Sequence, residues 1–124
     1  MRKLLFGFGL LVLMLSSCTF ETACTEEFRF ITLRIADETN QPVSGVTVIV
    51  TLQRTGDILD MGREQTDSSY LIADDSLTEA FSSTGDILTV VGNKNGKSFQ
   101  TQFEIRNNGC HTEKISGPNV VVLK

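Results

Sequence analysis

Hydrophobic and polar residues alternate over most of the chain after residue 25, in short runs that turn-forming residues separate. Residues 46–52 (VTVIVTL) show the alternation most clearly, since every second residue is apolar and would lie on one face of an extended strand. Residues 28–36 (FRFITLRIA) predict a second strand. Its apolar phase shifts between Phe30 and Ile31, which indicates either a β-bulge at that point or a change of the neighbouring sheet.

The second half of the chain contains the clearest hairpin. Residues 87–91 and 98–105 predict two strands, and residues 92–97 (GNKNGK) between them are turn formers. In the second arm, one face carries Phe99, Thr101, Phe103 and Ile105. We therefore expect the alternating phenylalanines of the chain to belong to the core.

Shorter runs complete the predicted set of strands. Residues 70–73 and 79–81 predict short strands on either side of an acidic bend at residues 74–76 (DDS), and we expect that bend to be a solvated turn. Residues 119–123 contain a Val-Val-Val-Leu run that favours burial on both faces. No stretch after residue 18 shows a helical period. About seven short strands at this spacing predict an all-β fold, an antiparallel sandwich or barrel.

The start of the chain has a different pattern. Residues 1–3 (MRK) are basic, and residues 4–15 form an almost unbroken apolar run of twelve residues. A helix needs about 20 residues to span a bilayer, whereas a shorter run suits the apolar part of a signal peptide. Residues 15–18 (LSSC) then resemble the lipobox of bacterial lipoproteins. An ordinary secretory signal and a short uncleaved anchor are the alternatives.

The lipobox resemblance implies a processed protein anchored by lipid. Cys18 would take a diacylglyceryl group through a thioether, a peptidase would cut before it, and the new amino terminus would receive a further chain such as palmitate. The domains would be a signal peptide at residues 1–17, a lipid-anchored tether at residues 18–25 and a β-sandwich at residues 26–124. Two or more acyl chains anchor a protein stably. Thr19 rather than Asp follows the cysteine, which by resemblance to enteric sorting favours the outer membrane of a Gram-negative-type bacterium.

Two further cysteines remain once Cys18 is assigned to lipid. Exported bacterial domains fold in an oxidising compartment, so we expect a disulfide between Cys24 and Cys110. The alternative is a thiolate metal site made by these two residues and His111, the one histidine of the chain. Zinc sites favour paired short spacings such as Cys-x-x-Cys, and neither cysteine has such a neighbour. We therefore expect no metal ion, and we expect His111 at a strand end or in a loop.

Composition and charge narrow the function. The 124 residues include 11 Lys and Arg against 15 Asp and Glu, a net charge of −4, so nucleic acid is not expected as a partner. One histidine and no Gly-x-Ser-x-Gly motif disfavour a Ser-His-Asp hydrolase. Three carboxylates close in sequence, Asp74, Asp75 and Glu79, could act on a glycoside. With Asp57 or Asp60 they could bind Ca²⁺. Because these carboxylates lie in a turn, we favour neither glycoside hydrolysis nor Ca²⁺ binding. We expect no enzyme activity and no cofactor.

One segment resembles a known domain family. Residues 36–48 (ADETNQPVSGVTV) are similar to the opening of carboxypeptidase regulatory-like, transthyretin-related domains, where an Asp-containing turn and Pro-Val-x-Gly lead into a Val-rich strand. Residues 66–70 (TDSSY) resemble the family's Thr-Asp-x-x-Gly-x-Tyr segment, with the glycine missing and the spacing one residue shorter. The resemblance covers residues 28–92. It implies an antiparallel prealbumin-like (immunoglobulin-like) β-sandwich of about seven strands, and it brings no catalytic residues.

These features predict a lipid-anchored, non-catalytic structural or protein-interaction module of the cell envelope. Residues 19–23 separate Cys18 from Cys24 and can span at most roughly 17 Å. Besides membrane lipid, the candidate partner is therefore an envelope protein close to the bilayer. A small-ligand- or glycan-binding lipoprotein is the alternative, and a hydrolase comes third. Residues 120–123 could pair with a partner through an open strand edge, but their apolar run favours a strand inside the sandwich.

Overall fold

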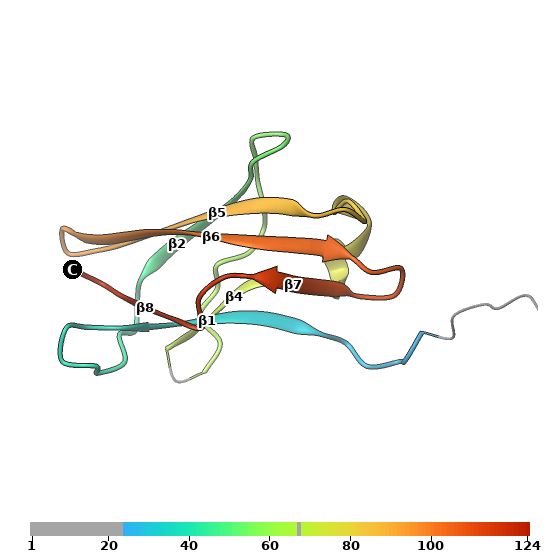
Figure 1. Ribbon diagram of the computed structural model, residues 1–124. Helices are drawn as coiled ribbons and strands as arrows, with labels where there is room; N and C mark the ends of the chain where they lie inside the picture. Colours follow the sequence, from blue (N-terminus) through green and yellow to red (C-terminus); the bar gives the residue numbers. More distant parts are fainter. Residues whose placement is uncertain (1–23, 67) are drawn as a thin grey trace, which may run out of the picture.

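The computed structural model describes residues 24–66 and 68–124, which form two β-sheets that pack face to face (Figure 1). The strands are β1 (Phe30–Ala36), β2 (Thr47–Leu52), β3 (Asp57–Ile58), β4 (Ser69–Asp74), β5 (Asp86–Lys94), β6 (Lys97–Asn107), β7 (Thr112–Ser116) and β8 (Val120–Val122), with the 3-10 helix η1 (Asp75–Ala80) between β4 and β5. One sheet has the order β4-β1-β8 and the other β3-β2-β5-β6-β7. The prediction of an all-β fold with two mostly antiparallel sheets is confirmed. The predicted signal peptide and Cys18 lie outside the described residues.

The core lies between the two sheets and follows the predicted alternation. In β2, Val48, Val50 and Leu52 are buried, whereas Thr47 and Ile49 are exposed. Fully buried apolar side chains of other strands are Leu33, Ile35, Tyr70, Ile72, Leu88, Val90, Phe103 and Ile105. Removing such side chains from water is the main favourable contribution to folding, so the apolar face predicted for each strand is what holds the two sheets together.

Strand β1 is the middle strand of the smaller sheet. It pairs antiparallel with β4, and the register shifts between Ile31 and Thr32. The extra residue at this shift is Ile72 of β4, whereas burial alternates regularly along β1 from Phe30 to Ile35, so the bulge predicted between Phe30 and Ile31 is wrong. It pairs parallel with β8, which departs from the predicted antiparallel pattern. The rings of Phe28 and Phe30 are exposed, so the expectation that the phenylalanines belong to the core is wrong for these two. Phe30 alternates with the buried Ile31 and therefore faces outward.

The last strand, β8, does not lie inside the sandwich. It is at the edge of the smaller described sheet, next to β1. Val120 and Val122 are exposed, whereas Leu123 after them is buried. The prediction of a strand inside the sandwich with both faces buried is wrong, because a three-residue edge strand leaves one face and one edge open to water.

The predicted hairpin is confirmed. Strands β5 and β6 pair antiparallel from Asp86 with Ile105 to Lys94 with Lys97, so both strands extend further into the predicted turn than expected. Asn95 and Gly96 form the two-residue turn, with φ angles of 52° and 77°. A type I′ turn requires positive φ at both positions, and Asn-Gly is the pair that adopts them most readily.

The segment after β4 is helical, so the strand predicted at residues 79–81 is wrong. Residues Asp75–Ala80 form η1 instead. Asp74 caps this helix, because its side chain accepts a hydrogen bond from the Ser76 N–H at 2.9 Å. Such local side-chain bonds to the backbone compete with strand pairing and favour a tight helical turn.

Arg54 fixes the far end of η1. Its guanidinium donates to the Ala80 carbonyl at 3.0 Å and forms an ion pair with Asp86, with Nε 2.8 Å from Oδ1. The Asp86 side chain is 3% exposed and also accepts from the Ser82 N–H at 2.7 Å. The hydrogen bonds from Arg54 lower the pKa of Asp86. Because η1 is held at both ends, the side chain of its first residue has a fixed position.

Tyr70 fastens the turn that carries the family resemblance. Its side chain is fully buried. Its hydroxyl donates to the Val43 carbonyl at 2.8 Å and accepts from the Val46 N–H at 3.1 Å. Burial raises the pKa of Tyr70. The connection between β1 and β2 is thereby bonded to β4.

Candidate functional site

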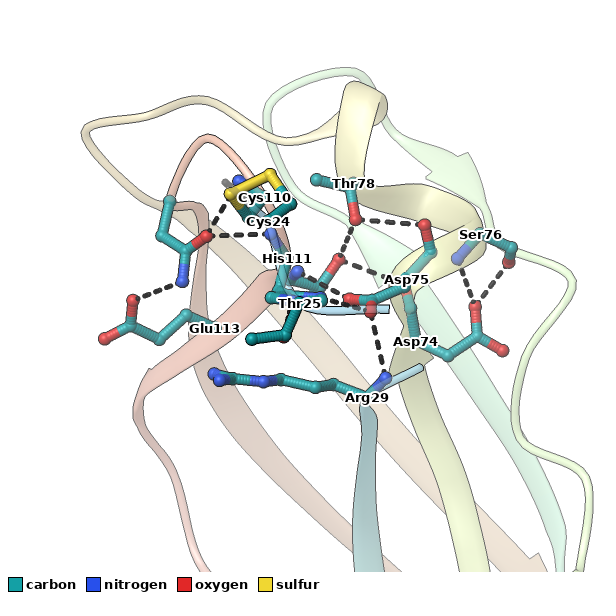
Figure 2. Close-up of polar contacts among 12 residues, drawn as sticks. Cys24, Thr25, Arg29, Asp74, Asp75, Ser76, Thr78, Cys110, His111 and Glu113 are labelled. Atoms are coloured by element: carbon teal, nitrogen blue, oxygen red, sulfur yellow. Dashed lines mark hydrogen bonds and ion pairs between the residues drawn. A yellow bond between two sulfur atoms is a disulfide. The ribbon is translucent and has the colours of Figure 1, made fainter. Parts of the chain in front are cut away.

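The first described residues are fastened to one end of the sandwich by a cluster of bonds (Figure 2). Cys24 and Cys110 form a disulfide, with their Cα atoms 5.2 Å apart. The next residue, Thr25, contacts His111, with 2.9 Å between Oγ1 and Nε2. We call Cys24, Thr25, Asp75, Cys110 and His111 the N-terminal clamp. The predicted disulfide is confirmed.

Asp75 is the centre of the N-terminal clamp (Figure 2). Its Oδ2 accepts a hydrogen bond from the Arg29 N–H at 2.9 Å and lies 2.6 Å from Nδ1 of His111. Its Oδ1 accepts from the Thr112 N–H at 2.8 Å. In return, the Asp75 N–H donates to the Arg29 carbonyl at 3.2 Å. One carboxylate therefore joins the N-terminal segment, η1 and the start of β7.

The acidic bend is not the solvated turn that the sequence predicts. The side chain of Asp75 is 10% exposed and that of His111 is 7% exposed. Burial by itself would raise the pKa of Asp75, but hydrogen bonds from Arg29, Thr112 and His111 outweigh it, and the pKa is lowered. The carboxylate points inward to these donors, which take the place of water. Asp75 is therefore held in its charged form.

His111 is fixed by contacts on three sides. It lies in the loop immediately before β7, as predicted, and its N–H donates to the Asn108 side chain at 2.8 Å. In the neutral imidazole with its proton on Nδ1, that nitrogen donates to Asp75, and Nε2 accepts from the Thr25 hydroxyl. In the protonated ring, both nitrogens donate and the imidazolium pairs with the carboxylate. Either form joins Thr25 to Asp75.

Thr25, His111 and Asp75 form a hydroxyl–imidazole–carboxylate chain, the connectivity of a nucleophilic triad. A nucleophile also needs a cavity that brings a substrate to its hydroxyl. A cavity of 480 Å³ beside the N-terminal clamp is lined by Asp75, Ser76, Thr78, Glu79, Asn107, Gly109 and Cys110. Neither Thr25 nor His111 belongs to that lining. What the contacts of the described residues show is that the N-terminal segment is fastened to the sandwich.

Thr25 and the contact between Asp75 and His111 were not predictable from sequence spacing. Thr25 is 86 residues and Asp75 is 36 residues away from His111 along the chain. The one signal is that His111 follows Cys110, so a disulfide to Cys24 brings the histidine close to the N-terminal segment. Only the position of η1 adds the carboxylate.

The disulfide also decides between the two interpretations of the cysteines. Metal ligation requires thiolates, and in the disulfide neither Cys24 nor Cys110 is one, so the alternative metal site with His111 is wrong. Among residues 24–66 and 68–124, no group of three or more His, Cys, Asp or Glu side chains is placed to hold a metal ion.

The carboxylates considered for Ca²⁺ or for glycoside chemistry have separate positions. Asp75 belongs to the N-terminal clamp, and Asp74 caps η1. Asp60 forms an exposed ion pair with Arg63 at 3.2 Å. Glu79 on η1 and Asp57 in β3 are exposed. Both carboxylates of the acidic bend, Asp74 and Asp75, therefore stabilise the fold through their hydrogen bonds.

Comparison with known proteins adds no relative. No family model matches the chain, and no curated protein or solved structure matches it. In the part of the chain that the structure describes, no helix has the length and apolar character needed to cross a membrane. The function proposed below is therefore based on the N-terminal clamp and on the sequence of residues 1–18.

Proposed function

We propose that this protein is a β-sandwich of the bacterial cell envelope, anchored by acylated Cys18, that acts as a non-catalytic structural or protein-interaction module. The N-terminal clamp is the observation that carries this proposal. An anchor at Cys18 would hold the domain through the first described residue that is bonded to it. That residue is Cys24, which is covalently bonded to Cys110. An anchor would thus hold the whole sandwich.

Bonds beyond the disulfide strengthen this attachment. The first and last residues of a domain are usually poorly ordered unless they are tied down. Here Thr25 is bonded to His111, and Arg29 exchanges two hydrogen bonds with Asp75 before β1 begins. An N-terminal segment that is bonded to the domain in this way suits a protein that is connected to a membrane through that segment.

The short tether would keep the domain beside the bilayer. Residues 19–23 can span at most roughly 17 Å, and the six Cα–Cα steps from Cys18 to Cys24 at most roughly 22 Å. A partner protein would therefore lie in the same membrane or directly next to it. We propose the outer membrane of a Gram-negative-type bacterium, since Thr19 follows the cysteine.

The finer fold that we propose is a prealbumin-like (immunoglobulin-like) sandwich of about seven strands, as the family resemblance implies. Residues 36–48 connect β1 to β2 through a turn, which agrees with the order of elements in that family. The bonds from Tyr70 to Val43 and Val46 give the resembling residues a shared structural role.

The test of the anchor is Cys18→Ala in the full chain, expressed in a bacterium that processes lipoproteins. We expect loss of labelled palmitate, failure of leader removal or loss from the membrane fraction. Ser17→Ala is the matched control, because it keeps a small residue before the cysteine and should still be acylated. Unchanged mass and fractionation of the Cys18→Ala protein would contradict the proposal.

The test of the module is co-purification from membranes after crosslinking of the acylated protein. We expect neighbours that are themselves embedded in or bound to the membrane. A thermal shift with sugars, peptides or Ca²⁺ would instead favour the ligand-binding alternative. Recovery of only distant soluble partners would contradict the short reach of the tether.

A further inference from the structure

We infer that Phe28 and Phe30 contact the lipid surface of the membrane to which the protein is anchored; this inference rests on the proposed acylation of Cys18. The two side chains are 49% and 56% exposed. Their rings pack edge to face, with centroids 5.0 Å apart. Together they form one apolar patch, which we call the Phe28–Phe30 pair.

The Phe28–Phe30 pair is held on the surface by the backbone around it. Between the two residues, Arg29 exchanges hydrogen bonds with Asp75, its N–H donating and its carbonyl accepting. After them, Ile31 is buried in the core. Successive side chains of an extended chain point to opposite sides, so with Ile31 facing the core, Phe30 faces outward. Phe28, two residues earlier, lies on the same side, where its ring contacts that of Phe30.

The position of the Phe28–Phe30 pair links it to the tether. Cys24, where the N-terminal clamp begins, is four residues before Phe28. The six Cα–Cα steps from Cys18 to Cys24 keep the acylated residue within roughly 22 Å of that point. The exposed aromatic side chains and the anchor are therefore at the same end of the chain and within reach of the same bilayer.

The chemistry of the patch fits the interfacial region of a bilayer. Burying an apolar side chain is favourable, and phenylalanine is among the residues that interfacial amphipathic segments bury at the boundary of headgroups and acyl chains. The two ring planes are inclined by 60°, so they do not offer one flat face on which a sugar could stack. A lipid surface deforms around such a pair, so it is the occupant that we propose.

Charges nearby favour a zwitterionic lipid surface. Glu26 and Glu27, directly before the Phe28–Phe30 pair, are exposed, and so is Arg29 between the two phenylalanines, which leaves these three residues with a net charge of −1. Carboxylates near the surface are repelled by anionic lipids, and salt screens that repulsion. The contact should therefore be stronger on phosphatidylcholine vesicles than on vesicles rich in phosphatidylglycerol.

The chain contains no tryptophan, so a single introduced tryptophan reports its own surroundings. We would place it by Phe28→Trp or Phe30→Trp, purify the acylated full-length product and reconstitute it into phosphatidylcholine vesicles with brominated acyl chains. Ile58→Trp is the matched control, because Ile58 is 71% exposed and belongs to β3 at the edge of the other sheet. At positions 28 and 30 we expect a blue-shifted emission and at least about twofold stronger quenching by bromine than at position 58.

Flotation of the vesicles separates the two proposals. A protein that does not float with the vesicles overturns the anchor and this contact with it. A protein that floats, but whose tryptophan is quenched no more at positions 28 and 30 than at position 58, overturns only the lipid contact. A blue shift that grows with the number of protein molecules per vesicle, without quenching by the brominated lipid, would mean that a second copy of the chain covers the two phenylalanines. That result also overturns the lipid contact.

Discussion

The carboxylate of Asp75 and the imidazole of His111 meet at 2.6 Å, although 36 residues separate them in the chain. Asp75 is the first residue of η1, and His111 is the last residue before β7. Because Asp75 also bonds the backbone of Arg29, this single contact links the N-terminal segment to both sheets.

Replacement of Asp75 should cost more stability than replacement of His111. Asp75→Ala leaves the N–H groups of Arg29 and Thr112 without their acceptor and removes the charge partner of the histidine. We expect a loss of about 3–4 kcal/mol in the free energy of unfolding. His111→Ala leaves Asp75 with its two backbone donors, so its cost should be about 1–3 kcal/mol. Urea denaturation of the oxidised protein measures both.

The double variant of Asp75 and His111 tests whether the two side chains act together. If they are coupled, its loss of stability should be smaller than the sum of the two single losses. Additive losses would mean that the 2.6 Å contact contributes little, and that the backbone bonds of Asp75 carry its whole effect.

Stability should fall on acidification partly because of Asp75. Its pKa is lowered in the folded protein relative to the unfolded chain, through bonds that outweigh the effect of burial. The charged carboxylate therefore stabilises the fold above its unfolded pKa of about 3.9, and this contribution is lost as the pH falls through the folded pKa. Asp75→Asn should lower the free energy of unfolding at pH 6 more than at pH 2.5.

Asp60→Asn is the matched control for the pH measurement, because it removes one carboxylate from an exposed ion pair outside the N-terminal clamp. It shows how much of the change comes from altered net charge alone. An Asp75→Asn protein with the same pH dependence as the wild type would contradict the role assigned to this carboxylate.

Loss of the disulfide should destabilise the domain without changing its fold. The bond between Cys24 and Cys110 closes a loop with a sequence separation of 86 residues. On the chain-entropy account, that constraint contributes at most about 4.6 kcal/mol. Cys24→Ser with Cys110→Ser and the reduced wild type should therefore unfold at similar, lower urea concentrations. Two free thiols at these positions in the oxidised, denatured protein would remove the basis of this prediction.

Tyr70→Phe should loosen the turn between β1 and β2. The hydroxyl serves one donor and one acceptor of the backbone, at Val46 and Val43. Its removal leaves both groups unsatisfied in a buried place, so we expect a loss of about 1–3 kcal/mol with the core side chain otherwise retained. Hydrogen exchange at the Val46 N–H should increase more than exchange at the Val90 N–H in the central strand of the five-stranded sheet. Equal protection at Val46 before and after the change would refute the role of the hydroxyl.

Local patterns predicted those parts of the fold that depend on neighbouring residues. The alternation in residues 46–52 gave the buried face of β2, and Asn95 with Gly96 gave the hairpin. The pattern was wrong where distant partners decide. Residues 79 and 80 belong to η1, whose end is bonded by the distant Arg54. Strand β8 pairs in parallel with β1, which is more than 80 residues earlier in the chain.

By itself, the sequence determined an all-β domain with a disulfide, since strand periodicity, turn residues and cysteine parity are local or countable properties, and it predicts a leader of the lipobox type. Only the tertiary structure decided that Thr25, Asp75 and His111 meet, and that Phe28 and Phe30 stay exposed. The physical reason is that burial depends on what the rest of the chain places opposite a side chain. A carboxylate in a turn lies in water or against backbone donors according to contacts made dozens of residues away.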